Sequence, residues 1–485
     1  MLLPYAWIGT WGQFDFSDLM GYYNLQAEAF LDGGLSVAPP PGQELTQDLI
    51  PFEGRYYLQW GPFPAVPHAA AILAGASISD RLVCLLAGWL TAVLFLEIVL
   101  EMRRRFYPET PLWVCWSFFF SFALATPAAV VALRGAVYHE SIGVAALGVV
   151  TAFWAFLKYS ENFSPAWLFA AGLAIAVAVT SRVTQGLYAA GLAAGIWACE
   201  RRRGRLLPRL ALFAAPVAAA ALLMLAYNQA RFGSPFEYGL KYLPASWAKA
   251  QPYDLRRVPE NLAHYLLAPF RLTGDVPWIR HAGWRGGTRV EVAEEMSSLV
   301  LASPFLLLAL LRGRGERPPA ARIFRWTAAG SGLLVFFALL CYFWAARRYM
   351  HDFLPAWTIA AFAGAAGWVQ SGQTWQRWRP PAIAILALSA ALHLHLCFFQ
   401  ALAWSPSDPN AMKAFARWSP LARRLSPGPK LDEQEAMVNN DLGVVFLKER
   451  RYAEAIRHFE RAAERLPQSE RIQANLRLAR SLVAR

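Results

Sequence analysis

The chain has 485 residues, of which 56% are hydrophobic, 16% are charged and 20 are tryptophans. This composition, with a mean hydropathy of +0.29, excludes an ordinary soluble domain and predicts an all-α, polytopic membrane protein. The net charge of +13 does not indicate nucleic acid as a partner, because the basic residues form short clusters between apolar segments.

The first 81 residues combine a short apolar stretch with an acidic, aromatic loop. Residues 1–12 (MLLPYAWIGTWG) are too short to cross a bilayer and lack the basic and small-residue features of a signal peptide. We expect them to be part of a first span that begins upstream, with a start site assigned too late. The residues from 14 to 81 then form a loop on one membrane face.

Ten apolar segments follow and predict a transmembrane helical domain over residues 82–403, with about ten to eleven spans in all. Some segments are shorter than the ~20 residues of a perpendicular span, so broken or re-entrant helices are expected among them. The segments are 82–100, 111–133, 142–157, 167–180, 183–199, 210–227, 296–311, 327–343, 353–369 and 381–403.

Arginine clusters set the orientation. They follow the first, fifth and seventh segments, which predicts that these three exits are cytoplasmic. By alternation, the N-terminal loop, a large loop at 228–295, the RRYMHD stretch and the C-terminus are exoplasmic. The arginines are Arg103, Arg104, Arg105, Arg201, Arg202, Arg203, Arg205, Arg209, Arg312, Arg314, Arg317 and Arg322.

The residue spacing predicts no metal centre. The five cysteines are scattered singly through apolar segments, and His393 and His395 are two residues apart, so they face different sides of a helix. His264, His281 and His351 stand alone in the sequence. A divalent cation held by outer-loop carboxylates is left open, and the chain has no phosphate-binding glycine motif ahead of a helix.

The C-terminus predicts a separate module. A Pro-rich linker at 404–435 precedes a charged helical segment at 436–485 that fits one tetratricopeptide repeat and a capping helix. Small or aromatic residues fill the packing positions, and Pro467 ends the second helix. An unrelated amphipathic hairpin is the alternative. The matching positions are Ala436, Asn439, Leu442, Gly443, Phe446, Ala455, Phe459, Ala462 and Pro467.

Several outer-face motifs together carry a family resemblance. They are FDFSDLMGYYNLQAEAFLDGGL, GRYYLQWGP, VYHES, TSRVT, YNQARFGSP and RRYMHDFLP. The sequence resembles integral-membrane glycosyltransferases of the GT-C fold, in particular the bacterial protein mannosyltransferase and aminoarabinose transferase group. The resemblance implies a multi-pass protein of the bacterial inner membrane that transfers a sugar from a polyprenyl-phosphate donor on the exoplasmic face.

Such a transfer needs a base for the acceptor proton and cations for the departing phosphate. We expect Asp18 to be the carboxylate base and Asp15 to be the second choice; helix capping by Asp18 is the alternative. Asp48 and Glu53 are weaker candidates.

The phosphate-binding candidates lie where apolar segments reach the outer face. Ionisable residues at membrane depth indicate function, while interfacial anchoring is the alternative. Arg182 is expected to bind the lipid phosphate or to pair with Glu140, and an arginine pair beside a tyrosine suits a phosphate clamp. The candidates are His139, Glu140, Arg182, Arg347, Arg348, Tyr349 and Asp352, with weaker sugar or acceptor contacts at Tyr22, Tyr23, Tyr56, Tyr57, Asn228 and Arg231.

Two other functions are weighed against this one. A transporter or flippase predicts mid-membrane charges and internal pseudo-symmetry, neither of which is evident. A noncatalytic scaffold would present the repeat module, on the exoplasmic side, to a protein partner.

Overall fold

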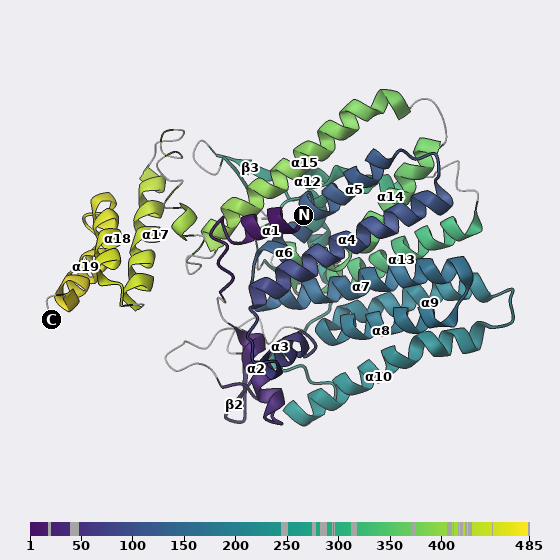
Figure 1. Cartoon of the computed structure of the whole chain (residues 1–485), viewed down its shortest axis with the longest axis horizontal. Coiled ribbons are helices and arrows are strands. Elements are labelled where there is room, and N and C mark those ends of the chain that lie inside the picture. The colour runs from purple at the N-terminus through teal and green to yellow at the C-terminus, as the bar shows by residue number, and fades with distance from the viewer. Residues whose placement is uncertain are drawn as a thin grey trace.

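The computed structural model is a bundle of long helices with small strand pairs at one end (Figure 1). The all-α, polytopic class predicted from composition is confirmed. The structure describes residues 1–17, 21–38, 48–243, 251–273, 278–281, 289–292, 294, 296–311, 318–370, 375–404, 410, 412–415, 417, 421, 424, 429–448 and 450–483.

Each of the ten predicted apolar segments coincides with helix. Within the described residues, five helices are long and apolar enough to cross a membrane: α4, α7, α10, α13 and part of α15. The elements are α4 (Asp80–Phe106), α5 (Leu112–Leu124), α6 (Ala128–Leu133), α7 (Val137–Asn162), α8 (Pro165–Ser181), α9 (Leu187–Glu200), α10 (Leu206–Phe232), α12 (Leu299–Ala302), η6 (Pro304–Leu310), α13 (Pro319–Cys341), α14 (Leu354–Gln370) and α15 (Trp375–Trp404).

Two of the segments are broken helices. The second divides into α5 and α6 at Thr126, whose hydroxyl donates to the Phe122 carbonyl at 2.7 Å and accepts from the Ala128 N–H at 3.2 Å. Pro127 lacks an N–H and therefore starts a new helix here. The seventh divides into α12 and the 3₁₀ helix η6, again at a proline.

The described cytoplasmic exits, at the ends of α4, α7 and α9, meet at one end of the bundle, which we call the basic end; residues 312–317 of the seventh exit lie outside the described residues. Arg105, at the end of α4, donates to the Leu157 carbonyl of α7 at 2.7 Å. The Tyr159 hydroxyl of α7 donates to Glu200, the last residue of α9, at 2.5 Å. α4, α7 and α9 thus end on the same side, as the alternation predicts.

The N-terminal residues occupy the opposite end, which we call the polar end. The polar end contains α2 (Tyr22–Leu31), the paired strands β1 (Leu49–Phe52) and β2 (Arg55–Leu58), and α3 (Ala65–Leu73). α1 (Leu2–Gly9) packs on α4 and α6, and the Tyr5 hydroxyl donates to the Ala123 carbonyl at 2.6 Å. Helix α2 ends before Gly33, whose φ of +73° lies in the left-handed region that favours glycine.

The large outer loop is mainly short pieces. α10 continues to Phe232, beyond the predicted loop start at 228, because its last turn is held by buried contacts described below. The pieces are η2 (Leu240–Tyr242), η4 (Leu255–Arg257), α11 (Val258–Leu262), the π-helical η5 (Ala263–Leu267), β3 (Phe270–Leu272) paired with β4 (Ile279–His281), and β5 (Glu291–Val292) paired with β6 (Trp344–Ala345).

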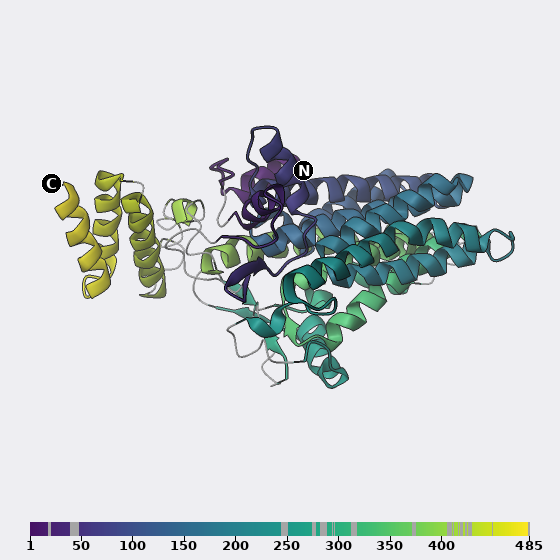
Figure 2. The ribbon, with the colours of Figure 1, turned by 90° about the horizontal axis from the view of Figure 1, so that it is seen from below.

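Three C-terminal helices form a small unit of their own: α17 (Pro429–Lys448), α18 (Tyr452–Arg465) and α19 (Glu470–Val483). Leu442, Phe446 and Phe459 are buried in its core, and a Cβ on Gly443 would lie 2.5 Å from the Phe459 ring. The predicted helical hairpin and third helix are present; the assignment to a tetratricopeptide repeat stays a prediction. Figures 1 and 2 place these helices beyond the polar end.

Candidate functional site

Most of the predicted phosphate-binding residues come together at the polar end. The 3₁₀ helix η7 (Arg347–Asp352) lies between α13 and α14, and all six of its residues are buried. Arg182 reaches it from the end of α8. We call Arg182, Arg347, Arg348, Tyr349 and Asp352 the arginine cluster.

Arg182 pairs with Asp352. Its Nε lies 2.7 Å from both carboxylate oxygens, and its Nη2 lies 2.7 Å from Oδ2. The guanidinium also sits 4.7 Å from the centre of the Tyr349 ring, a cation–π distance. The alternative pairing of Arg182 with Glu140 is therefore wrong, because the carboxylate of Asp352, on η7, accepts from both Nε and Nη2 of the guanidinium group.

The other two arginines of the cluster also have buried partners. Arg348 Nη1 lies 2.5 Å from Glu294 Oε1, and its guanidinium lies 4.3 Å from the Tyr138 ring. Burial acts to raise the pKa of Glu294, but the charges of Arg348 and its neighbours outweigh it and lower this pKa to about 2. Arg347 Nη1 lies 2.7 Å from His281 Nε2. The outer loop is thus tied to η7.

A second group, the carboxylate–histidine cluster, consists of His68 of α3, Asp80 of α4 and Glu140 of α7. His68 Nε2 lies 3.0 Å from Glu140 Oε1 and 3.9 Å from Asp80 Oδ1. One ligand atom from each residue lies within 4.8 Å of the others, and all three residues are buried. Burial lowers the pKa of His68 to about 4, so its imidazole is neutral at physiological pH.

The tautomer of His68 follows from its other neighbour. Its Nδ1 lies 3.0 Å from Asn24 Oδ1, and the Asn24 amide nitrogen donates to the Ile78 carbonyl at 3.0 Å. Nδ1–H is therefore the donor to Asn24, and the Nε2 lone pair faces the Glu140 carboxylate. Two acceptors at 3.0 Å need a proton or a cation between them. Nitrogen and carboxylate oxygen are ligand types that Zn²⁺ and related divalent ions accept.

The first turn of α7 separates the two clusters. Tyr138 stacks on Arg348 on one side, and Glu140 contacts His68 on the other. His139, between them, is buried, and neither of its ring nitrogens has a hydrogen-bond partner among the described residues. The short VYHES motif therefore touches both groups.

Of the two acids expected to act as base, the structure describes only Asp15, which forms no hydrogen bond or ion pair with the described residues of either cluster. Asp18 lies outside the described residues. The described part of α2 has Gly21 at its N-cap, and both roles predicted for Asp18 stay predictions. Asp15 is partly exposed; its carboxylate accepts from the Ser17 N–H at 3.0 Å, and this bond lowers its pKa.

The weaker sugar-contact candidates divide into two groups. Tyr22 and Tyr23 are buried at the start of α2, and the Tyr23 ring lies 6.1 Å from the His68 ring. Tyr57 is buried against Phe232, while Tyr56 of the same strand is half-buried.

Asn228 and Arg231 of α10 have internal contacts. Arg231 donates to the Leu58 carbonyl at 3.0 Å and to Asn228 Oδ1 at 2.7 Å, and its guanidinium stacks 3.9 Å from the Tyr227 ring. These contacts join the end of α10 to β2.

Sequence spacing missed His68, Asp80 and Glu294. His68 is a single histidine in an apolar helix, and Asp80 directly precedes an apolar segment, so neither has a partner nearby in the sequence. Asp48 is a stronger candidate for the base than the sequence indicated. Its Oδ1 accepts a hydrogen bond from Trp60 Nε1 at 3.0 Å, and burial raises its pKa although Trp60 and Arg348 act to lower it. The Trp60 ring lies 6.0 Å from the Tyr138 ring, which stacks on Arg348.

Comparison with solved structures finds similar chains. ArnT from Cupriavidus metallidurans bound to undecaprenyl phosphate matches 99% of this chain and 75% of its own length, with a TM-score of 0.46 and 16% identity. The archaeal oligosaccharyltransferase AglB from Archaeoglobus fulgidus, in complex with an inhibitory peptide and a dolichol-phosphate, matches 88% of this chain and 59% of its own, with a TM-score of 0.43 and 14% identity.

Both matched proteins are membrane glycosyltransferases of the GT-C fold, the fold that the motifs resemble. Because the TM-scores are below 0.5, the similarity adds no argument about the activity of this chain. No protein-family model matches the chain, and no curated protein matches it significantly.

Proposed function

We propose that this chain is a membrane glycosyltransferase that moves a sugar from a polyprenyl-phosphate carrier to an acceptor at the exoplasmic, polar end of the bundle. The observation that carries the proposal is the arginine cluster. Three arginines converge there with Tyr349 at one end of a helical bundle, beside buried carboxylates and a neutral histidine.

The arginine cluster suits a lipid phosphate. Arg182 and Arg348 present planar donor forks that match phosphate oxygens, and Tyr349 lies 4.7 Å and 5.1 Å from their guanidinium groups. Their present partners, Asp352 and Glu294, hold these arginines in place. Charges already oriented in a buried site stabilise a departing phosphate without reorganisation.

The acceptor proton needs a carboxylate base. Asp18 is our first candidate and Asp15 the second, as expected from the sequence. Asp48 is a further candidate, because it adjoins the arginine cluster through Trp60 and Tyr138 and its pKa is raised.

A divalent cation would be held by His68, Asp80 and Glu140. When bound, it would supply a positive charge at the polar end, across the first turn of α7 from the arginine cluster. The C-terminal helices lie beyond the same end, which supports an exoplasmic module; that this module contacts a protein partner is part of the proposal.

Transfer from polyprenyl-phosphate sugars to acceptors, measured with the purified full-length protein in liposomes, tests the proposal. Asp18→Asn should lower the rate about 10²-fold or more, whereas Asp32→Asn, an exposed acid after α2, should leave it unchanged. Arg182→Lys keeps the charge but loses the fork, and it should also slow transfer. No transfer with any donor would favour the scaffold, and transport of the lipid without transfer would favour a flippase.

The cation is tested by metal content. Elemental analysis of the purified protein should show about one bound Zn²⁺ or Mn²⁺, lost in His68→Ala and retained in His264→Ala, a buried histidine of the outer loop. The same metal content in both variants would contradict the assignment.

A further inference from the structure

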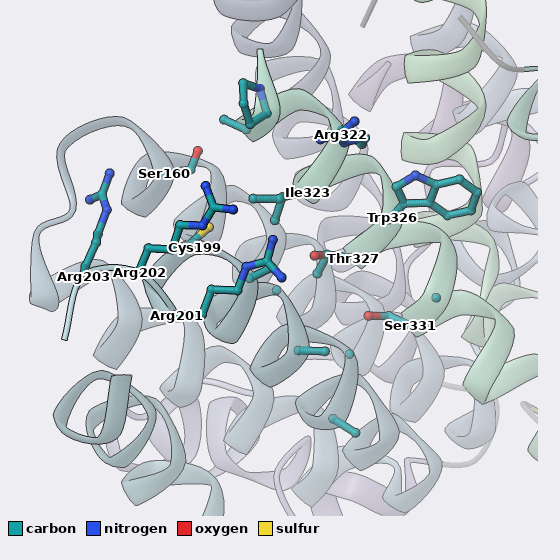
Figure 3. A pocket seen from close by; sticks show the side chains of 18 of the residues that line it. Ser160, Cys199, Arg201, Arg202, Arg203, Arg322, Ile323, Trp326, Thr327 and Ser331 are labelled. Carbon is teal, nitrogen blue, oxygen red and sulfur yellow. The ribbon is translucent and has the colours of Figure 1, made fainter. Parts of the chain in front are cut away.

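A large cavity opens at the basic end of the bundle, away from both clusters described above. Its volume is about 1080 Å³, and it lies between α9 and α13 and reaches the end of α7 (Figure 3). α7 and α13 are long and apolar enough to cross a membrane, so we expect the side of the cavity to face lipid and its mouth, at the basic end, to face water.

The floor of the cavity is a close approach of two helices. A Cβ on Gly191 would lie 1.9 Å from the Ser331 hydroxyl, and one on Gly195 would lie 2.5 Å from the Thr327 hydroxyl. Ala190 and Ala194 of α9 are exposed beside this contact. Because these residues are small, an apolar groove remains between α9 and the side chains of α13.

The walls of the groove are apolar and open to lipid. Ile323, Trp326 and Leu334 of α13 line it, and Trp326 is 58% exposed. Ser331 is fully buried at the floor, and its hydroxyl has no hydrogen-bond partner within the described residues. The groove therefore offers an apolar channel with one unsatisfied polar group.

The mouth of the groove is strongly basic. Arg201, Arg202 and Arg203 follow α9, and Arg322 stands in the first turn of α13; all four are exposed and line the cavity. In the part of the chain that the structure describes, none of them forms an ion pair with a carboxylate. In Figure 3 the side chains of Arg201 and Arg202 point across the cavity toward α13.

Aromatic rings orient two of these arginines. The Arg201 guanidinium lies 5.2 Å from the Trp197 ring, and the Arg203 guanidinium lies 3.3 Å from the Phe163 ring. Arg202 and Arg322 have no such contact among the described residues, so their donors are available to a ligand. Four exposed arginines without ion pairs can bind an anion, and the adjoining groove can hold an apolar chain.

We propose that this cavity binds an anionic phospholipid of the cytoplasmic leaflet, with its phosphate at Arg202 and Arg322 and one acyl chain in the groove between α9 and α13. The basic end is the cytoplasmic side by the positive-inside pattern, where anionic lipids attract basic pockets between membrane helices. The groove favours a lipid over free phosphate, because only a lipid fills the apolar channel beyond the arginines.

Binding is tested with the full-length protein in detergent, by native mass spectrometry and by thermal unfolding with added lipid. Phosphatidylglycerol should bind and raise the unfolding temperature, and phosphatidylcholine should do neither. The double variant Arg202→Gln/Arg322→Gln should bind phosphatidylglycerol roughly thirtyfold more weakly. Each arginine near an anionic headgroup contributes about 1 kcal/mol of binding free energy, and the loss of two such contributions corresponds to this factor.

Arg205→Gln/Arg209→Gln is the matched control, because it removes the same charge from the basic end outside the cavity. It should bind phosphatidylglycerol like the parent protein. Ala194→Trp leaves every charge in place but fills the groove, so it should weaken lipid binding. Inorganic phosphate should not displace phosphatidylglycerol from the parent protein.

Four results would overturn the proposal. They are equal binding of phosphatidylcholine, equal weakening by the two double variants, displacement of the lipid by inorganic phosphate, and preferential binding of undecaprenyl phosphate. The last would make the cavity a donor-lipid site, and the third a simple anion site. Sugar transfer does not enter these measurements, so they do not depend on the proposed function.

Discussion

The buried ion pair between Arg348 and Glu294 makes the sharpest stability prediction. Both side chains are less than 10% exposed, and Nη1 and Oε1 lie 2.5 Å apart. A carboxyl whose pKa falls from the ordinary 4.5 to about 2 gains about 3 kcal/mol of stability in its charged form. Glu294→Gln should therefore lower the free energy of unfolding by about 3 kcal/mol, because Arg348 loses its buried partner.

Equilibrium unfolding in mixed detergent micelles at pH 7 measures this change. Arg348→Met alone should be similarly destabilised, whereas the double variant Glu294→Gln/Arg348→Met should recover much of the loss, because no buried charge is then unpaired. The surface pair of Glu237 and Lys241, in which the lysine is 60% exposed, provides the control: Glu237→Gln should change the free energy by less than about 1 kcal/mol.

The same pair predicts a pH dependence. Because folding lowers the pKa of Glu294, its contribution is fully present above about pH 4.5 and is lost as the pH falls toward 2. The parent protein should therefore lose more stability than Glu294→Gln over this interval. Unfolding free energies of parent and Glu294→Gln that agree at pH 7 would refute the reasoning.

Three further substitutions have defined outcomes. Asp352→Asn leaves the buried fork of Arg182 without a carboxylate, so both the unfolding temperature and sugar transfer should fall, while Asp254→Asn, at an exposed pair with Arg256, should change neither. Gly172→Ala would place a methyl group 2.1 Å from a backbone oxygen of α10 and should destabilise the bundle by about 1–3 kcal/mol in the unfolding assay. Gly443→Val should speed proteolysis of the C-terminal helices in the intact protein without slowing cleavage of the bundle loops, because its Cβ would press into a buried ring; unchanged proteolysis would contradict this packing.

Hydropathy and charge predicted the large-scale architecture. The ten apolar segments form helices, and the described arginine connectors after α4 and α9 lie at one end, because burial in lipid and the retention of arginine on one membrane side depend on local composition. The motifs also located much of the candidate site: Arg182, Arg348 and Asp352 each end or begin an apolar segment, and all three lie at the polar end.

The partners of these residues depend on contacts between distant parts of the chain. Arg182 pairs with Asp352, 170 residues away in the sequence, and not with Glu140 as the sequence allowed. His68, Asp80 and Glu140 come together from three separate helices. A residue's period along a helix shows which face it occupies, but it does not show which other helix packs against that face. The composition and spacing therefore determined the membrane class, the order of the helices and the end that bears the site. Only the tertiary packing decided which charges neutralise each other and which basic cluster, at the opposite end, lies over a groove.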